Sequence, residues 1–172
     1  MFFQESSTNG HCPQNCICKW KGGKESVECI NATFSKIPPL ETTTQVLDLS
    51  FNNLLRINEN VFRDRNLYNL QKIYLRHCSI HAIVGRCFEG ITNLVELDLS
   101  YNLLQVIPKE ALKDCGYLMT LSLKGNPIRR VHQDTFDNLK VSVDCNWPPH
   151  TTAVLHHHTP HNRKHGKYSS FN

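Results

Sequence analysis

Apolar and polar residues alternate in four short segments of this chain. In each segment a leucine or isoleucine stands at every second position, so a strand formed there has one apolar face and one polar face. A helix would need apolar residues at every third or fourth position, and the alternation therefore predicts short strands rather than a helical bundle. The four segments cover residues 46–54, 72–80, 96–104 and 120–128.

The segments recur at a regular spacing. Their first apolar residues are Leu47, Ile73, Leu97 and Leu121, which follow one another at steps of 26, 24 and 24 residues. A second set of large apolar residues keeps the same steps: Phe62, Phe88, Leu112 and Phe136. Two registers with one period indicate an internal repeat. Its pattern, L-x-x-L-x-L-x-x-N-x-L, is that of a leucine-rich repeat.

Stacked copies of such a repeat predict an α/β solenoid, a leucine-rich-repeat horseshoe whose short strands form a parallel sheet on the concave side. The inward leucines and the second register of apolar residues fill the space between the concave and convex sides. The residue that follows each strand is expected to turn inward and to bond backbone groups that the bend leaves unpaired. This position holds Asn52, Cys78, Asn102 and Asn126, and the pattern accepts asparagine or cysteine there.

Four of the eight cysteines lie close together near the N-terminus: Cys12, Cys16, Cys18 and Cys29. Such a cluster indicates either a disulfide framework or a metal site. The spacing lacks the paired C-x2-C or C…H arrangement of zinc ribbons and fingers. The cluster stands just before the first repeat, where a solenoid needs a cap over its apolar end. Residues 12–40 are therefore interpreted as a disulfide-stapled N-terminal cap.

The cap and the repeats resemble those of known proteins. The order C-P-x2-C-x-C-x10-C is similar to the N-terminal cap of extracellular leucine-rich-repeat proteins, which implies the pairs Cys12–Cys18 and Cys16–Cys29. Several longer segments resemble insect Kekkon-type proteins, which combine leucine-rich repeats with an immunoglobulin domain. The match runs from about residue 12 to residue 139. It is carried by residues 18–24, 27–29, 44–50, 69–75 and 92–100.

This resemblance implies a molecule of adhesion or receptor-modulating type, extracellular or at the plasma membrane, whose partner is a protein ligand or a cell-surface receptor. Members of that family have a signal peptide, capped repeats, an immunoglobulin domain and a membrane span. Here the apolar stretch at Met1–Phe3 is too short for a signal peptide, and no apolar run reaches the roughly 18 residues of a membrane span. The chain is therefore interpreted as a truncated fragment of such a protein.

Charge and motifs argue against several other classes. The formal net charge is +4, and the basic residues are dispersed among acidic ones, which argues against nucleic acid as a partner. The sequence contains no Gly-rich phosphate loop, no G-x-S-x-G elbow and no H-E-x-x-H motif. Neither catalysis nor a cofactor is therefore expected.

The repeat pattern stops near residue 140, where the composition changes. The expected organisation is an N-terminal extension (1–11), the cap (12–40), about four repeats (41–140) and a disordered, His-rich tail (141–172). A shortened cap built from Val141, Val143 and Trp147 is the alternative for the start of this tail. Metal binding by the tail is an alternative role, although no carboxylate stands near its histidines to orient them. These are His150, His156, His157, His158, His161 and His165.

The polar positions of the strands face outward on the concave sheet and form the candidate binding site. Aromatic residues and arginine, which are enriched in protein-binding hot spots, gather there on a rigid support. The candidate partner-binding residues are Phe51, Tyr74, Arg76, His77 and Tyr101. The alternative is a structural or matrix role in which the repeats only space other domains.

Two further expectations concern side-chain chemistry. Asn31-Ala32-Thr33 is the only N-x-S/T sequon, so Asn31 is the expected glycosylation site of a secreted chain. Cys78 is expected to be a buried thiol. The pairing of the other three cysteines stays open: they are Cys87 and Cys115, which fall on the convex side, and Cys145.

Overall fold

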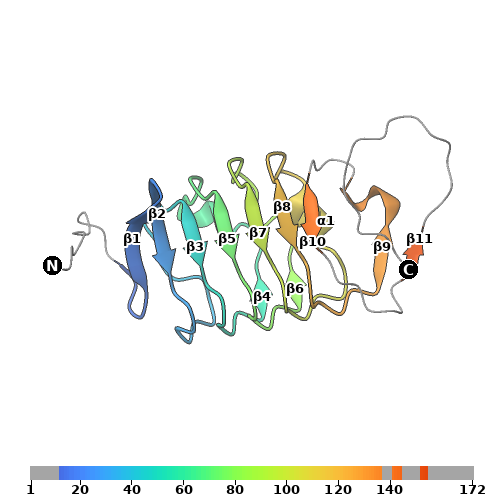
Figure 1. Ribbon diagram of the computed structural model, residues 1–172, viewed down its shortest axis with the longest axis horizontal. Helices are drawn as coiled ribbons and strands as arrows, with labels where there is room; N and C mark the ends of the chain where they lie inside the picture. Colours follow the sequence, from blue (N-terminus) through green and yellow to red (C-terminus); the bar gives the residue numbers. More distant parts are fainter. Residues whose placement is uncertain (1–11, 137–140, 145–151, 155–172) are drawn as a thin grey trace.

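The computed structural model describes residues 12–136, 141–144 and 152–154 of the chain. These residues form an elongated body in which short strands stack side by side (Figure 1). Among them, the main sheet has the order β1 (Ile17–Lys21), β2 (Lys24–Glu28), β3 (Val46–Asp48), β5 (Lys72–Tyr74), β7 (Glu96–Asp98), β8 (Thr120–Ser122) and β10 (Ser142–Asp144). This is the solenoid that the repeat pattern predicts.

The strands from β2 to β10 run parallel to their neighbours, while β1 and β2 form an antiparallel hairpin. Leu47, Ile73 and Leu97 pair in register across β3, β5 and β7. All three are completely buried, so the apolar faces of the strands stack into one continuous core. The predicted parallel sheet with inward leucines is confirmed.

The parallel ladder begins inside the predicted cap. In β2, Val27 pairs with Leu47 and is buried like the leucines of the repeats. Its neighbour Cys29 is also completely buried, two positions further along the chain. The cap is therefore not a separate lid, because its second strand is itself the first layer of the solenoid.

At the other end the ladder continues past residue 140. In β10, Val143 pairs with Leu121 of β8 and packs against the core. This strand departs from the expectation that disorder begins at residue 141, because Val141 and Val143 both pack against the core and β10 extends the sheet without the rest of the repeat motif. Trp147, Cys145 and the six histidines of the tail lie outside the described residues.

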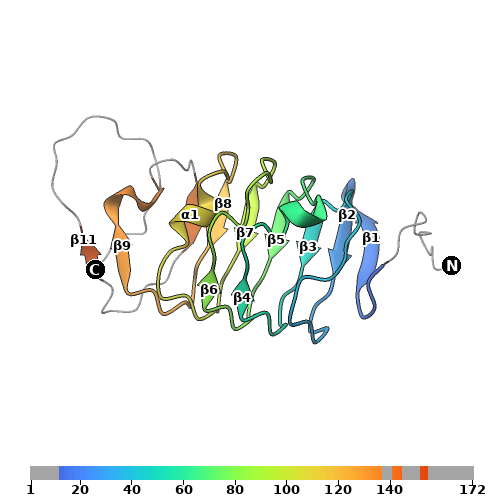
Figure 2. The same cartoon turned by 180° about the vertical axis from the view of Figure 1, so that it is seen from behind.

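Short, irregular pieces build the opposite side of the body, which Figure 2 shows. They are β4 (Arg56–Ile57), η1 (Arg63–Arg65), β6 (Ala82–Ile83), α1 (Lys109–Leu112), β9 (Arg130–His132), η2 (Gln133–Phe136) and β11 (Thr152–Val154). β4 pairs with β6 and β9 pairs with β11, both in parallel. Beneath them the rings of Phe62 and Phe88 stack at 5.5 Å, and Leu112 is buried one repeat further on, as the second register predicts.

An inner ladder of polar residues follows the strands: Asn52, Cys78, Asn102 and Asn126, all of them buried. The Oδ1 atom of Asn102 accepts hydrogen bonds from the backbone N–H groups of Cys78 and Ile80, at 2.9 and 3.0 Å. Its Nδ2 atom donates to the carbonyls of Leu75 and Leu99, at 2.7 and 3.0 Å. Asn52 and Asn126 join neighbouring repeats in the same way, so the predicted asparagine ladder is confirmed.

Cys78 makes a weaker step in the inner ladder. Its Sγ atom donates to the carbonyl of Leu49 at 3.1 Å, but a thiol is a poor acceptor compared with an amide oxygen. The backbone compensates, because the N–H of Leu54 donates to the carbonyl of Cys78 itself, at 3.1 Å. Burial raises the pKa of the Cys78 thiol to about 11, which keeps it a neutral donor. The predicted buried thiol is confirmed.

Two disulfides hold the cap: Cys12–Cys18 and Cys16–Cys29. The paired Cα atoms are 5.8 and 4.2 Å apart. The pairing that the family resemblance implies is confirmed. Cys87 and Cys115, which the sequence leaves open, are both buried free thiols.

Candidate functional site

Three rings stack on one another along the surface of the solenoid. Phe51 and His77 lie with ring centroids 4.8 Å apart and an interplanar angle of 10°. His77 and Tyr101 lie 4.6 Å apart at 4°. We call Phe51, His77 and Tyr101 the aromatic column. Each ring belongs to a different repeat, and the column therefore spans three layers of the solenoid.

The backbone at each position explains why the rings are parallel. Phe51, His77 and Tyr101 have φ values of 63°, 51° and 55°, in the left-handed region that few residues other than glycine adopt. Their N–H groups donate to the carbonyls of the next repeat, at 2.8, 3.2 and 2.6 Å respectively. Identical backbone conformations in successive layers project the side chains in the same direction, one strand spacing apart.

One end of the aromatic column is closed by a glycine. Gly125 occupies the equivalent position in the next repeat, with φ +70°. A Cβ atom added there would stand 2.5 Å from Cδ1 of Tyr101, so the ring lies directly over the glycine. The outer parts of the column remain open, because Phe51 is 47% and Tyr101 is 43% exposed.

Tyr74 and Arg76 form a second group, held by acidic residues of β7. The hydroxyl of Tyr74 donates to Oε1 of Glu96 at 3.0 Å. Lys72, on the same strand, pairs with the other oxygen of Glu96 at 2.7 Å. Nε of Arg76 lies 3.8 Å from Oδ2 of Asp98. These contacts hold the side chains of Lys72, Tyr74 and Arg76 against β7.

The same contacts set the charge state of the group. Burial raises the pKa of Tyr74, and the hydrogen bond to Glu96 raises it further. The hydrogen bond to Glu96 also raises the pKa of Lys72. Both shifts favour the protonated forms of Tyr74 and Lys72, which are the forms that donate to Glu96.

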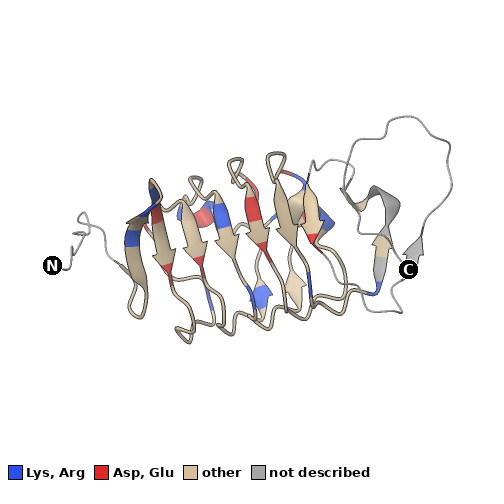
Figure 3. Cartoon of the chain, viewed as in Figure 1, with Lys and Arg blue, Asp and Glu red and all other residues tan. Residues whose placement is uncertain are grey.

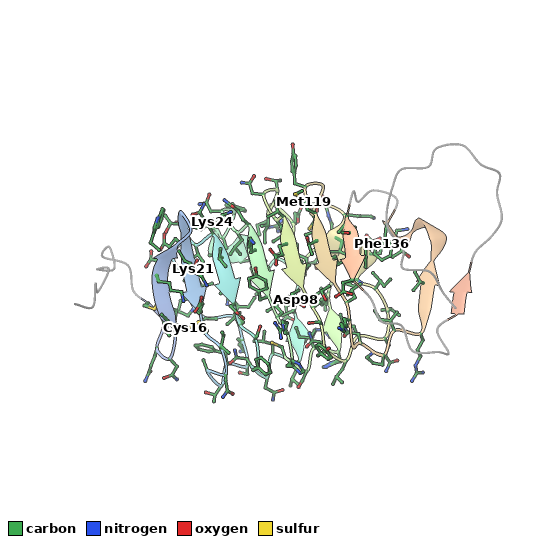
Figure 4. The ribbon with its side chains drawn as sticks, in the orientation of Figure 1. Cys16, Lys21, Lys24, Asp98, Met119 and Phe136 are labelled. Carbon is green, nitrogen blue, oxygen red and sulfur yellow. A yellow bond between two sulfur atoms is a disulfide. The ribbon has the colours of Figure 1, made fainter. Side chains whose placement is uncertain are left out.

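A hollow of about 520 Å³ lies between the cap hairpin and β5. Its charged and aromatic lining consists of Lys21, Lys24, Glu28, Asp48, Lys72, Tyr74 and Arg76. Figure 3 shows the basic residues on β1, β2 and β5 and the acidic residues on β7, and Figure 4 shows Lys21 and Lys24 at the hairpin end of the sheet. The lining of the hollow thus carries four basic and two acidic side chains.

The hairpin part of this surface is missing from the sequence-based prediction, which begins the concave face at β3. Its signal is present in the sequence, because Ser26 and Glu28 alternate with the buried residues Val27 and Cys29 as the repeats do. The five predicted partner-binding residues separate into the aromatic column and the pair Tyr74 and Arg76. The predicted glycosylation site, Asn31, is exposed at the end of β2's layer.

The described part of the chain also bears on metal binding and on membrane insertion. It holds no group of three or more His, Cys, Asp or Glu residues arranged to bind a metal ion. The metal-binding alternative rests on the tail histidines, which lie outside that part. None of its helices has the length and apolar character that crossing a membrane requires.

Comparison with known proteins agrees with this architecture. The profile of the family described as Leucine rich repeat matches residues 42–104 and 92–142. The chain is similar to Leucine-rich repeat-containing protein 3 of Danio rerio, at 34% identity over 118 residues, which are 67% of this chain and 43% of that protein. Leucine-rich repeat-containing protein 3B of Homo sapiens is 29% identical over 162 residues, covering 88% of this chain and 52% of that protein.

A further relative is Tsukushi of Xenopus tropicalis, which is 32% identical over 120 residues, covering 55% of this chain and 34% of that protein. The chain spans about half the length, or less, of the relatives it matches.

Proposed function

Because this chain belongs to the leucine-rich-repeat family, we propose that it is a non-catalytic module that recognises another protein outside the cell through its concave sheet. The observation that carries this proposal is the aromatic column beside Tyr74 and Arg76, an array of large side chains on β5 and in the turns that follow β3, β5 and β7 of the parallel sheet. Aromatic residues and arginine are the side chains most enriched in protein-binding hot spots.

The order of these side chains favours affinity. Binding costs about 0.5–1.5 kcal/mol for each flexible side chain that must be immobilised. The rings of the aromatic column are held by stacking, and Tyr74 and Arg76 are held by Glu96 and Asp98. Much of this cost is therefore met during folding rather than during binding. The partner would place acidic or hydrogen-bonding groups toward the hollow and apolar groups on the rings.

The two cap disulfides support a location in an oxidising compartment, because such bonds persist outside the cell and are rare in the cytosol. We propose an extracellular or plasma-membrane location on this ground. The finer proposal is an adhesion or receptor-modulating role of Kekkon type. It rests on the sequence resemblance alone, since the relatives reported above are vertebrate proteins of other names.

The test is a binding screen with the whole chain. The chain, secreted as an Fc fusion, is applied to a panel of purified cell-surface and secreted ectodomains. Binding is then measured for Tyr74→Ala with Arg76→Ala, and we expect the affinity to fall at least about tenfold, as for hot-spot truncation. Arg63→Ala is the matched control, because this arginine is an exposed, ion-paired residue of η1 outside the concave sheet.

Three results would count against the proposal. Normal binding by the double variant would show that the concave sheet is not the recognition surface. Equal loss in the Arg63→Ala control would show that the effect is not local to that sheet. A chain that binds no ectodomain on the panel would favour the structural alternative, in which the repeats only space other domains.

A further inference from the structure

We propose that Asn31 carries an N-linked glycan whose first sugar stacks on Phe51 and extends the aromatic column by one ring. This goes beyond the proposed recognition function, because it assigns an ordered carbohydrate to a defined place on the solenoid. It rests on the position of the sequon in the ladder of layers.

Asn31 is the member of the cap layer that corresponds to the aromatic column. The ladder that pairs Val27 with Leu47 and Glu28 with Asp48 brings Asn31 opposite Phe51 when it is continued along both chains. The N–H of Asn31 donates to the carbonyl of Ser50 at 3.0 Å, the same bond that each residue of the aromatic column makes to its next layer.

The backbone conformation agrees with this correspondence. Asn31 has φ 52°, close to the values of 63°, 51° and 55° at Phe51, His77 and Tyr101. Its side chain therefore leaves the backbone in the same direction as the three rings, about one strand spacing of 4.8 Å from Phe51. That spacing matches the 4.8 and 4.6 Å at which the rings already stack.

The inner ladder fixes the sequon in this orientation. Oδ1 of Asn52 accepts hydrogen bonds from the N–H groups of Ala32 and Phe34, at 3.1 and 2.8 Å. Asn52 directly follows Phe51. The side chain of Asn52 therefore holds the backbone after Asn31, while the preceding residue carries the ring on which the sugar would lie. Asn31 and Thr33, the two residues the sequon requires, are both exposed.

The open face of Phe51 suits a sugar. His77 covers one face of the ring, yet 47% of the residue is exposed, and we assign the open face to the side of Asn31. The face of an aromatic ring carries partial negative charge and attracts the C–H groups that line one side of a pyranose. An N-acetylglucosamine joined to the Asn31 amide begins just beyond the short asparagine side chain, level with the outer edge of the phenyl ring. It would cover an apolar surface that otherwise faces water.

The experiment uses the full chain secreted from a eukaryotic cell and trimmed with an endoglycosidase to a single N-acetylglucosamine. Nuclear magnetic resonance of the sugar should show ring protons shifted upfield by the ring of Phe51. Phe51→Leu keeps an apolar side chain but removes the ring, and the shift should disappear. Tyr101→Leu is the matched control at the other end of the aromatic column, and it should leave the shift unchanged.

A second measurement does not depend on spectra. The single sugar should lower the unfolding equilibrium constant about two- to tenfold, the range expected for one aromatic contact, when compared with the same chain produced without the glycan. In the Phe51→Leu background this stabilisation should vanish, whereas Tyr101→Leu should retain it.

Several results would overturn the proposal. If Asn31 of the secreted chain carries no glycan, the first part of the proposal is wrong. If Asn31 is modified but the sugar protons are not shifted, the stacking is wrong. Equal stabilisation with and without the Phe51 ring would also contradict the stacking. None of these measurements uses a protein partner, so their failure is distinguishable from failure of the concave-sheet recognition.

Discussion

The inner ladder and the aromatic column are neighbours in the sequence but opposites in the structure. Phe51 precedes Asn52, His77 precedes Cys78, and Tyr101 precedes Asn102. In each pair the first residue is exposed and the second is buried. The left-handed backbone at the first residue of each pair sends the two side chains to different sides of the same turn.

This difference shows how one turn of a repeat serves two purposes. The inner position must bond buried backbone groups of two layers, which restricts it to side chains such as asparagine or, with weaker bonding, cysteine. The outer position has no such duty, and it holds phenylalanine, histidine, tyrosine and glycine in successive repeats. The side chain at the outer position can therefore differ from repeat to repeat without loss of the fold, which leaves it available for specific recognition.

The division of roles between the inner ladder and the aromatic column is tested most directly by truncating one residue of each in the same turn. Asn102→Ala should destabilise the chain by about 3–5 kcal/mol, because several buried N–H and carbonyl groups lose their partners at roughly 1–3 kcal/mol each. Tyr101→Ala should cost about 1 kcal/mol or less. Urea unfolding followed by circular dichroism measures both, and equal losses would contradict the division of roles.

Removing a disulfide should have the next largest effect. Cys16→Ala with Cys29→Ala should cost about 2–4 kcal/mol. The carbonyl of Cys29 accepts from Nδ2 of Asn52 at 2.7 Å, so the first step of the inner ladder should loosen too. Faster hydrogen exchange at the Ala32 and Phe34 amides would report this.

The other disulfide provides the control. The loop between Cys12 and Cys18 is shorter, with a separation of 6 residues against 13, so its removal should cost less stability. A larger loss from the shorter loop, or unchanged exchange at Ala32, would show that Cys16–Cys29 does not anchor the inner ladder.

The buried thiol of the inner ladder predicts a pH dependence. Its pKa is raised from 9.0 to about 11, so between these values the unfolded thiol loses its proton while the folded one keeps it. The folded state then binds more protons, and stability should fall with rising pH by up to about 1.4 kcal/mol per pH unit from this thiol.

A variant isolates this contribution. Cys78→Ala has no thiol at this position, so the stability difference between it and the natural chain should narrow from pH 9 to pH 11. Denaturant titrations at three pH values measure it. A constant difference would mean that Cys78 ionises alike in both states. Cys115, whose pKa burial raises to about 12, acts equally in both proteins and cancels.

The smallest expected effect on stability belongs to the middle of the aromatic column. His77→Asn, which tolerates the left-handed backbone, should cost about 1 kcal/mol or less while removing both stacking contacts. Thermal unfolding measures this loss. The same variant should weaken partner binding far more than it weakens the fold. An unfolded His77→Asn chain would show that the aromatic column is structural as well.

The buried faces of the strands and the inner ladder could largely be predicted from the sequence. The period of Leu47, Ile73 and Leu97 determines which face of each strand is buried, because side chains alternate strictly along a strand. The inward role of Asn102 and the substitution by Cys78 follow from their fixed offset to those leucines. The cap disulfides follow from the resemblance of the cysteine pattern rather than from spacing alone.

The tertiary structure decided the rest. Stacking of Phe51 on His77 requires that the two repeats lie one strand spacing apart. It also requires a left-handed backbone at both residues, which could not be predicted from the residue types. β10 forms because residues 142–144 pair with the otherwise unpaired edge of β8, although their own segment lacks the repeat pattern. Local periodicity determines which side of a strand faces inward, but contacts between layers depend on the rise and register of the whole solenoid.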